Sequence, residues 1–330
     1  MQTPKWVRYL VWSAVTFIVL VTTGLLWVQQ MIASAERSGE TSGLDFKVDM
    51  MVRRVRTFRG AASQRNRRCT YADVWALSPP VEMVVARRAL RKTFSVAKQD
   101  GAFELVRTPA GPYWIPNRDI DTLAETLVEQ QNDVYEGPVG VRAGDVVLDC
   151  GANVGAYTRH ALDRGAKVVV AIEMAPESLE CLRRNLEREV TGGRVIIYPK
   201  GVWNKDDELQ LSTGDDWAST ASSVVLDRGR RGPKVPLTTI DKLVAELQLL
   251  RVDFIKMDIE GAEMQALEGA RDTVRRFHPR MAISVEHRPT DPDRIPGVVH
   301  GLWPEYVSEC GPCTNVNGSI QPDVLFAQAR

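Results

Sequence analysis

From Gly144 to the C-terminus, short apolar runs alternate with longer amphipathic segments. The apolar runs consist mainly of Val, Ile, Leu and Met without polar alternation, a pattern typical of strands buried on both faces of a parallel sheet. Because segments with helical periodicity separate these runs, the sequence predicts an α/β fold with a doubly wound sheet. The predicted strands are Val146–Asp149, Lys167–Glu173, Arg194–Tyr198, Val252–Asp258 and Met281–Val285, followed by late strands at Tyr306–Ser308 and Asp323–Phe326.

The same periodicity predicts helices on both faces of this sheet. Upstream of Gly144, two short strands flank the turn Pro109–Pro112, and an amphipathic helix follows at Asp121–Gln131. The predicted helices of the sheet region are Tyr157–Arg164, Ser178–Glu189, Ile240–Gln248 and Glu263–Arg276, and the two upstream strands are Phe103–Val106 and Tyr113–Ile115.

The N-terminal region has a different composition. Leu10–Val28 carries no charge, and about twenty apolar residues are needed to cross a bilayer as a helix. We therefore predict an N-terminal transmembrane anchor within residues 1–30. The alternative is a cleaved signal peptide, because Ala33-Ser34-Ala35 resembles a cleavage site, but the apolar run exceeds the usual length of about 7–15 residues.

Residues 31–100 are predicted to form a basic, helical, membrane-proximal linker region, and residues 101–330 the main domain. Arginines cluster between Arg53 and Arg68, and Val52, Val55 and Phe58 form an apolar stripe at helical spacing. A basic helix near a membrane is suited to anionic lipid headgroups. The alternative is a solvated arginine face packed against its own domain. We do not expect nucleic acid as a partner, because the segment lacks interleaved aromatic residues.

The overall charge and the cysteine content narrow the possibilities further. The formal net charge is zero, so no global field recruits acidic partners. Five cysteines in 330 residues do not suggest a disulfide framework, and we expect reduced thiols. No His/Cys cluster has the spacing of metal ligands, so no metal site is predicted.

The loop after the first strand of the sheet carries the most informative motif. In an open α/β sheet, ligands bind beyond the carboxyl ends of the strands. Gly151 permits a tight turn and a close approach of the backbone to a ligand, and Gly155 opens the next helix. Asn153 stands where a dinucleotide-binding loop would have its middle glycine. The loop therefore favours a ligand without a pyrophosphate, and S-adenosylmethionine is such a ligand.

The ends of the next two strands extend this prediction to the rest of the cofactor. Glu173 ends the second strand, where an acidic side chain can accept hydrogen bonds from ribose hydroxyls. The third strand ends near Gly201 and Val202, where an adenine ring could lie against the backbone. The alternative for Glu173 is an exposed glutamate that begins the turn at Pro176.

Carboxylates crowd the end of the fourth strand, in the segment 256–263 (KMDIEGAE). Crowded carboxylates repel each other, so a cation or hydrogen-bond donors should compensate them. We predict Asp258 and Glu260 as catalytic residues, and we expect Glu263 to start the following helix. His287 follows the fifth strand and has a reference pKa suited to taking a proton from a hydroxyl. The alternative is a structural histidine.

Three stretches together resemble the FkbM-type methyltransferase family: 146–158 (VVLDCGANVGAYT), 171–186 (AIEMAPESLECLRRNL) and above all 254–270 (FIKMDIEGAEMQALEGA). The resemblance covers roughly residues 129–326. It implies a class I, Rossmann-like fold and transfer of a methyl group from S-adenosylmethionine, commonly to a hydroxyl oxygen. It also implies a cofactor role for five residues and a site role for Asp258 and Glu260. The five are Asp149, Gly151, Asn153, Gly155 and Glu173.

The resemblance and the anchor together define the expected biology. The acceptor is expected to be a small molecule, a sugar or a lipid-linked glycan. Because S-adenosylmethionine is made and used in the cytosol, we expect the catalytic domain on the cytoplasmic side of the membrane. Three alternatives remain: a redox protein using Cys310-Gly311-Pro312-Cys313, a nicotinamide-dependent oxidoreductase, and a tethered cofactor-binding module without catalysis. The missing middle glycine argues against the second.

Overall fold

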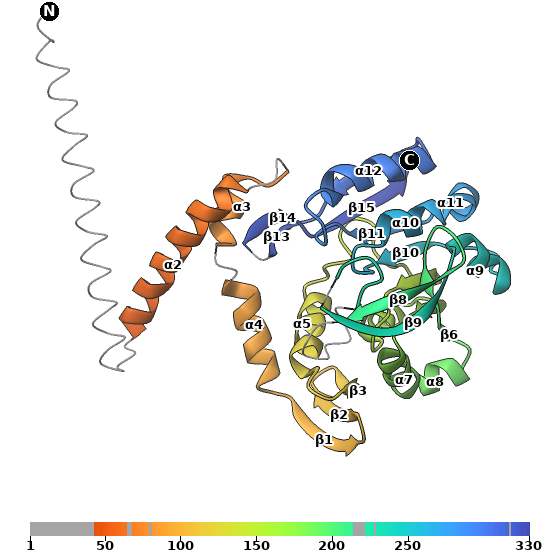
Figure 1. The fold of residues 1–330 in the computed structure, drawn as a ribbon, viewed down its shortest axis with the longest axis horizontal. Coiled ribbons are helices and arrows are strands. Elements are labelled where there is room, and N and C mark those ends of the chain that lie inside the picture. The colour runs from red at the N-terminus through yellow and green to blue at the C-terminus, as the bar shows by residue number, and fades with distance from the viewer. Residues whose placement is uncertain (1–42, 65–67, 79–80, 214–221, 228, 317) are drawn as a thin grey trace, which may run out of the picture.

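The computed structural model describes residues 43–64, 68–78, 81–213, 222–227, 229–316 and 318–330 (Figure 1). The predicted anchor at Leu10–Val28 lies outside these residues. Within the described ranges, no helix combines the length and the apolar character that crossing a membrane requires.

A seven-stranded sheet forms the centre of the molecule. In spatial order the strands are β12 (Tyr306–Cys310), β15 (Val324–Ala329), β11 (Arg280–Ser284), β10 (Phe254–Met257), β4 (Val146–Cys150), β5 (Val168–Ile172) and β6 (Val195–Tyr198). The five strands from β11 to β6 are parallel to one another, as predicted, whereas β15 runs antiparallel to both β11 and β12. The strand order reverses direction between β10 and β4, which places a ligand-binding switch point there.

Alternate residues of the inner strands enter two different hydrophobic clusters, because successive side chains point to opposite faces of a sheet. Leu148 and Ile255 pack with α9 (Ile240–Glu246), α10 (Glu263–Glu268), α11 (Arg271–Phe277) and α12 (Asp291–Leu302). Val147 and Phe254 pack with α6 (Ala156–Asp163) and α7 (Pro176–Asn185) on the other face. Helices therefore cover both faces, as predicted.

The sequence missed two breaks and a second sheet. The predicted helix Ser178–Glu189 ends at Asn185 and continues as α8 (Glu187–Thr191). The predicted helix Glu263–Arg276 is interrupted at Gly269, where a Cβ would lie 2.0 Å from the backbone oxygen of Trp203. Strands β7 (Gly201–Val202), β9 (Arg230–Thr238) and β8 (Asp207–Thr213) form a three-stranded sheet beside the main one. Their polar, partly exposed residues lack the apolar runs that identify buried strands.

A small antiparallel sheet comes before the seven-stranded sheet in the chain and is part of the same domain. It consists of β1 (Ser95–Asp100), β2 (Phe103–Thr108) and β3 (Gly111–Pro116), and α5 (Ile120–Gln131) follows. Residues of β2, β3 and α5 share one hydrophobic cluster with Val154 and Ala156, next to the glycine loop. Because β1 pairs with β2, the predicted boundary at residue 100 falls inside a hairpin.

Three helices precede this sheet: α2 (Gly43–Ser63), α3 (Tyr71–Ala76) and α4 (Val81–Arg91). Of the apolar stripe predicted on α2, Phe58 packs against α3: the centres of the Phe58 and Trp75 rings lie 5.2 Å apart, with the rings edge-on. Ala61 and Val74 pack with Ile320 of β14 (Ser319–Pro322), which pairs with β13 (Cys313–Val316). In Figure 1, α3 accordingly lies beside the β13–β14 hairpin.

Candidate functional site

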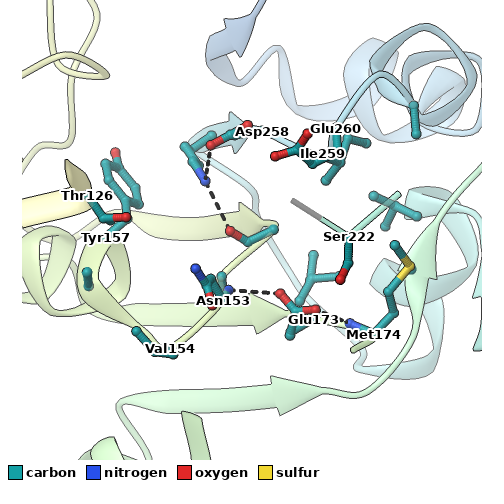
Figure 2. A pocket seen from close by; sticks show the side chains of 18 of the residues that line it. Thr126, Asn153, Val154, Tyr157, Glu173, Met174, Ser222, Asp258, Ile259 and Glu260 are labelled. Carbon is teal, nitrogen blue, oxygen red and sulfur yellow. Dashed lines mark hydrogen bonds and ion pairs between the residues drawn. The ribbon is translucent and has the colours of Figure 1, made fainter. Parts of the chain in front are cut away.

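A cavity of about 410 Å³ opens at the switch point, beyond the carboxyl ends of β4, β5, β10 and β11. Figure 2 shows side chains from several of these strand ends around it. Of the ten residues predicted as catalytic or cofactor-binding, eight line this cavity. They are Gly151, Asn153, Glu173, Gly201, Val202, Asp258, Glu260 and His287. Asp149 and Gly155 are not among the residues that line it.

The β4–α6 loop needs glycine at two positions, for a different structural reason at each. Gly151 adopts φ +83°, and a Cβ there would lie 1.9 Å from the backbone oxygen of Asp258. Only glycine therefore lets the loops after β4 and β10 approach each other this closely. Gly155 adopts φ +90° at the start of α6, where a Cβ would lie 2.9 Å from both Leu182 and Leu186. Gly155 is thus a packing position, and its contact with a cofactor stays a prediction.

Glu173 holds the loop from the neighbouring strand end. Its carboxylate accepts hydrogen bonds from the backbone N–H groups of Asn153 at 2.9 Å and of Met174 and Ala175 at 2.8 Å. Burial raises the pKa of Glu173, although these three hydrogen bonds oppose the rise. A carboxylate has about four acceptor positions, so capacity remains for a ligand hydroxyl.

Asp149 is fully buried beneath the loop. It accepts a hydrogen bond from Thr158 Oγ1 at 2.7 Å, and its other oxygen lies 3.6 Å from Lys256 Nζ. Burial raises the pKa of Asp149, while the charge of Lys256 and the bond from Thr158 lower it. In this structure Asp149 therefore supports Lys256 and α6, and a direct contact with the cofactor stays a prediction.

Lys256 connects the two loops that meet at the cavity. Its side chain is almost completely buried, and Nζ donates to the carbonyl of Gly151 at 3.1 Å. The same nitrogen lies 3.6 Å from Asp258 and 5.1 Å from the centre of the Tyr135 ring. Burial opposes the charge of Lys256, but Asp258 and Asp149 outweigh burial and raise its pKa. The lysine is the internal cation that the crowded carboxylates required.

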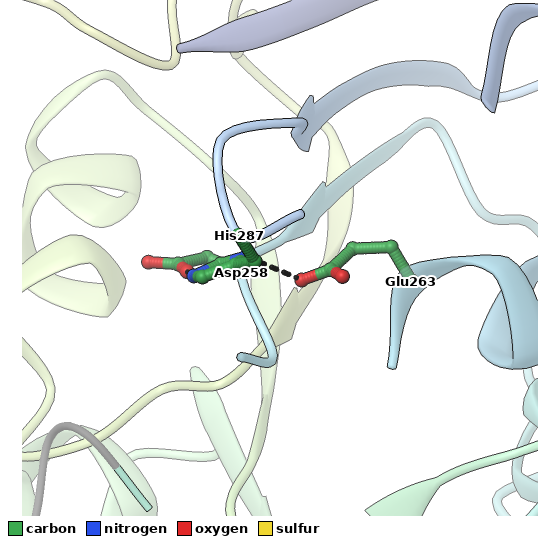
Figure 3. A group of neighbouring side chains, drawn as sticks. All are labelled: Asp258, Glu263 and His287. Atoms are coloured by element: carbon green, nitrogen blue, oxygen red, sulfur yellow. Dashed lines mark ion pairs between the residues drawn. The ribbon is translucent and has the colours of Figure 1, made fainter. Parts of the chain in front are cut away.

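His287 stands between two carboxylates at the end of β11 (Figure 3). Its Nε2 lies 3.4 Å from Asp258, and its Nδ1 lies 3.1 Å from Glu263, the first residue of α10. Glu260 lies 3.7 Å from Nε2. Burial opposes the charge of the ring, but Glu263, Asp258 and Glu260 outweigh burial and raise the pKa of His287 to about 10.

This electrostatic setting changes the role expected of His287. At neutral pH the ring already holds its proton, so it stabilises negative charge instead of accepting a proton. Asp258 receives a hydrogen bond from Tyr135 at 3.0 Å, and although burial raises its pKa, Lys256 and His287 lower it on balance. Asp258 therefore remains an anion that faces the cavity.

Asp258, Glu263 and His287 also form a group that could hold a metal ion, since one potential ligand atom of each lies within 4.8 Å of the others. The imidazole, however, stands between the two carboxylates with one ring nitrogen toward each. Without a metal ion, the protonated ring pairs with both carboxylates. The same three side chains offer ligand atoms that a metal ion could use instead.

Several cavity residues were missed by the sequence analysis. Five residues of α5 line the cavity, Gln130 and four others at the spacing i, i+3, i+4 and i+7, and Glu286 lines it beside His287. Burial and the neighbouring carboxylates raise the pKa of Glu286 to about 7. The four positions share one polar face of a predicted amphipathic helix, which could have marked them. They are Thr122, Glu125, Thr126 and Glu129.

The described residues fit an amino-acid-bearing adenosine cofactor. Asn153 lines the cavity, and its side-chain oxygen is buried without a hydrogen-bond partner among them. Glu173 retains acceptor positions for hydroxyls. The carboxyl groups of Asp258 and Glu260 line the same cavity and suit a positively charged sulfonium and ammonium.

Comparison with known proteins is consistent with this geometry. Residues 149–311, just under half of the chain, match the family model of the methyltransferase FkbM domain. These residues form an FkbM methyltransferase domain. The predicted family is confirmed, and S-adenosylmethionine is the cofactor of this domain. The match favours the methyltransferase prediction over the nicotinamide-dependent alternative.

Two curated relatives align with parts of this chain. The 31-O-demethyl-FK506 methyltransferase FkbM of Streptomyces tacrolimicus is 28% identical over 163 residues, which cover 41% of this chain and 62% of the relative. Methyltransferase 1 of Beauveria bassiana is 25% identical over 146 residues, which cover 38% of this chain and 58% of the relative. The chain thus spans about three fifths of the length of these relatives.

Solved methyltransferase structures are also similar to this chain. Methyltransferase FkbM from Methylobacillus flagellatus KT has 18% identity and a TM-score of 0.44, covering 77% of this chain and 61% of that protein. TYW2 from M. jannaschii, solved in complex with AdoMet, has 14% identity and a TM-score of 0.42, and the match covers 72% of this chain and 90% of that protein.

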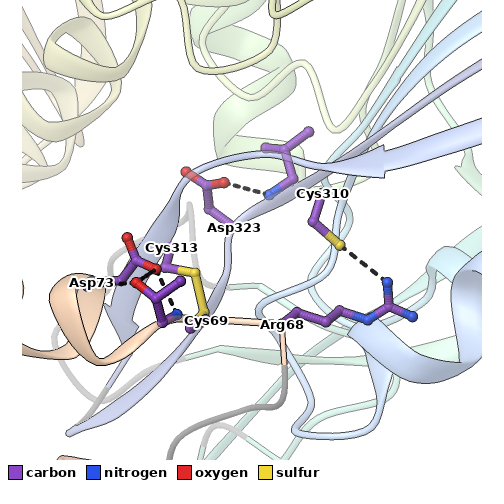
Figure 4. Close-up of a disulfide and its surroundings, with 8 residues drawn as sticks. Arg68, Cys69, Asp73, Cys310, Cys313 and Asp323 are labelled. Carbon is purple, nitrogen blue, oxygen red and sulfur yellow. Dashed lines mark hydrogen bonds between the residues drawn. A yellow bond between two sulfur atoms is a disulfide. The ribbon is translucent and has the colours of Figure 1, made fainter.

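The C-terminal cysteines correct one prediction. Cys69 and Cys313 form a disulfide between residues 244 positions apart, whereas the sequence suggested reduced thiols (Figure 4). The bond joins the start of α3 to the β13–β14 hairpin. Gly311 and Pro312 connect β12 to β13. Cys310 belongs to no disulfide, and its sulfur accepts a hydrogen bond from Arg68 at 3.5 Å. A cysteine count cannot identify such a pair, because the partners meet only in the folded chain.

Proposed function

We propose that this chain transfers a methyl group from S-adenosylmethionine to a hydroxyl oxygen of a small molecule, a sugar or a lipid-linked glycan. The observation that carries the proposal is one cavity in which the glycine loop and Glu173 meet the Asp258–Glu260 segment. The cofactor supplies an electrophilic methyl group when bound.

The chain's own residues would bind and orient the reactants. Glu173 and the backbone of residues 151–155 would hold the adenosine and amino-acid ends, and Gly201 and Val202 would border the adenine. Asp258, held by Lys256, Tyr135 and His287, would present a fixed negative charge to the sulfonium. Because these partners are fixed before binding, the charge costs little reorganisation when the methyl group moves.

Calorimetric titration of the full chain with S-adenosylmethionine tests the cofactor assignment. Glu173→Ala removes a charged hydrogen-bond acceptor worth about 1.5–3 kcal/mol, so the dissociation constant should rise roughly ten- to a hundredfold. Glu187→Ala is the matched control, because Glu187 is exposed on α8 and away from the cavity. Equal affinity of both variants and the wild-type chain would remove Glu173 from the cofactor site.

Methyl transfer needs a separate measurement. The full chain is incubated with S-adenosylmethionine carrying a tritium-labelled methyl group and with an extract of metabolites and lipids from the source cells. Labelled product is expected. Tight binding of the cofactor with no labelled product from any fraction is the result that the binding-module alternative predicts, and it would overturn the proposed activity.

We further propose that Leu10–Val28 anchors the chain and that the catalytic domain faces the cytoplasm, where S-adenosylmethionine is made. The exposed arginines 53, 56 and 59 on α2 suit a contact with anionic lipid headgroups. The Cys69–Cys313 disulfide weighs against a cytoplasmic placement, because disulfides persist mainly in oxidising compartments. Protease protection in sealed membrane vesicles distinguishes the two sides: a protected domain in right-side-out vesicles supports the cytoplasmic placement, and a cleaved one contradicts it.

A further inference from the structure

Helix α5 has a buried apolar face and a polar face that lines the cavity. Leu123, Ala124 and Leu127 belong to the hydrophobic cluster that α5 shares with β2 and β3, and Val128 is buried as well. Residues 122, 125, 126 and 129 form a stripe on the cavity side, and Gln130 extends it. The stripe offers two hydroxyls and two carboxylates in a row. We call these four residues, Thr122, Glu125, Thr126 and Glu129, the α5 stripe.

One member of the α5 stripe, Thr126, lies on a different side of the cavity from Glu173 (Figure 2). Figure 2 shows Thr126 beside Tyr157 on one side of the view and Glu173 with Met174 on the other. The stripe also lies outside residues 149–311, the part that matches the FkbM domain. The family core therefore provides the strand ends, and a segment before it provides this wall.

The charge of this wall restricts what it can bind. Glu129 lines the cavity together with Glu125, Asp258 and Glu286. The nearby cation Lys256 is already shared between Asp149 and Asp258. The imidazolium of His287 is likewise held by Asp258 and Glu263. Glu125 is paired with Arg87 at 3.1 Å, whereas no ion pair among the described residues holds Glu129 or Glu286. An anionic group placed beside these two carboxyl groups would be repelled when either is ionised, whereas hydroxyls would find acceptors and donors.

We propose that the α5 stripe is the acceptor subsite, that it takes a polyhydroxylated unit without negative charge, and that Glu129 is the catalytic residue that accepts the acceptor's hydroxyl proton. This inference rests on the proposed methyl transfer. In the step, the acceptor oxygen forms a bond to the methyl carbon and the pair of the broken carbon–sulfur bond remains on sulfur. The hydroxyl proton moves to the Glu129 carboxylate.

The surroundings of Glu129 also suit proton transfer near neutral pH. Burial raises the pKa of Glu129 to about 8, with further increases from Asp258, Glu286 and Glu125 and a decrease from Lys256. Tyr135 also faces this group of charges and holds its own proton, because burial raises its pKa well above the ordinary value. A base must be deprotonated, so the transfer rate should rise with pH through this range.

The test combines labelled methyl transfer, calorimetry and the charge of the product. Wild-type full chain, Glu129→Gln, Glu129→Asp and the control Glu187→Gln are compared with tritium-labelled S-adenosylmethionine and the cell extract that gives product. For Glu129→Gln we expect kcat to fall about 10²–10⁴-fold, with the cofactor dissociation constant within about twofold of wild type. Glu129→Asp should recover part of kcat, and the rise of rate with pH should be lost in Glu129→Gln.

The product provides an independent readout. After mild acid hydrolysis, the labelled unit should pass an anion exchanger at neutral pH. A retained, anionic unit would overturn the assignment of the subsite, and so would wild-type kcat with an unchanged pH profile in Glu129→Gln. Loss of cofactor binding in Glu129→Gln would place this residue in the cofactor site or the fold and would also overturn it. A wild-type chain that binds the cofactor but labels nothing refutes the proposed function itself, and the inference with it.

Discussion

Replacing Lys256 by methionine tests whether the fold depends on one buried cation. Lys256 is 3% exposed, and Asp149, 3.6 Å from its Nζ, is fully buried. The substitution keeps most of the apolar stem but leaves Asp149 with the Thr158 hydrogen bond and no opposite charge. Removing one partner of a buried ion pair costs about 3–5 kcal/mol, so the free energy of unfolding should fall by that amount.

The penalty should depend on pH in a defined direction. Without the lysine, the pKa of Asp149 in the folded chain rises further above its unfolded value. A carboxyl whose folded pKa is raised destabilises the fold above the unfolded pKa, and the penalty shrinks as pH falls and the folded form binds a proton. The loss in unfolding free energy should therefore be smaller at about pH 5 than at about pH 8, by up to about 1.4 kcal/mol per pH unit.

Urea unfolding of the full chain, followed by tryptophan fluorescence, measures the effect. Lys205→Met is the matched control, because that side chain is 66% exposed and its ion pair with Asp207 should contribute less than about 1 kcal/mol. The double variant Asp149→Asn/Lys256→Met should be less destabilised than the sum of the two single variants by about 0.5–3 kcal/mol. A Lys256→Met loss no larger than that of Lys205→Met, or strict additivity, would refute the reasoning.

Three further predictions concern other parts of the chain. Gly151→Ala places a Cβ 1.9 Å from the backbone oxygen of Asp258, so the loop must move; calorimetry should show cofactor affinity reduced by more than about tenfold, and unchanged affinity would disprove the constraint. Cys69→Ser should cost about 2–4 kcal/mol through loss of the bond to Cys313, and limited proteolysis should cleave α2 and α3 faster than in the wild-type chain, whereas equal rates would show that the bond does not hold them. Because the pKa of Glu129 is raised to about 8, its ionisation lowers the stability of the wild-type chain as pH rises from about 5 to about 9. In urea unfolding, the free energy of unfolding of Glu129→Gln should therefore increase relative to that of the wild-type chain over this range. A constant difference between the two would contradict this prediction.

Much of the candidate site could be predicted because its residues come immediately after strands in the sequence. Parallel strands bring their carboxyl ends to one edge of the sheet, so the residues after β4, β5, β10 and β11 had to meet there. Glu173 and Asp258 were found in this way. The roles of Asp149 and His287 were harder to predict, because burial and the carboxylates packed around them come from segments distant in the chain.

By itself, the sequence determined the strands, the helices between them, the glycine loop and the family to which residues 149–311 belong. These features are local, since they depend on periodicity and on short motifs. Only the tertiary structure decided that Cys69 reaches Cys313, that the polar face of α5 enters the cavity and that His287 keeps its proton. Each of these depends on distances between remote segments, and a carboxylate or thiol exerts its effect over a few ångströms of space whatever its separation along the chain.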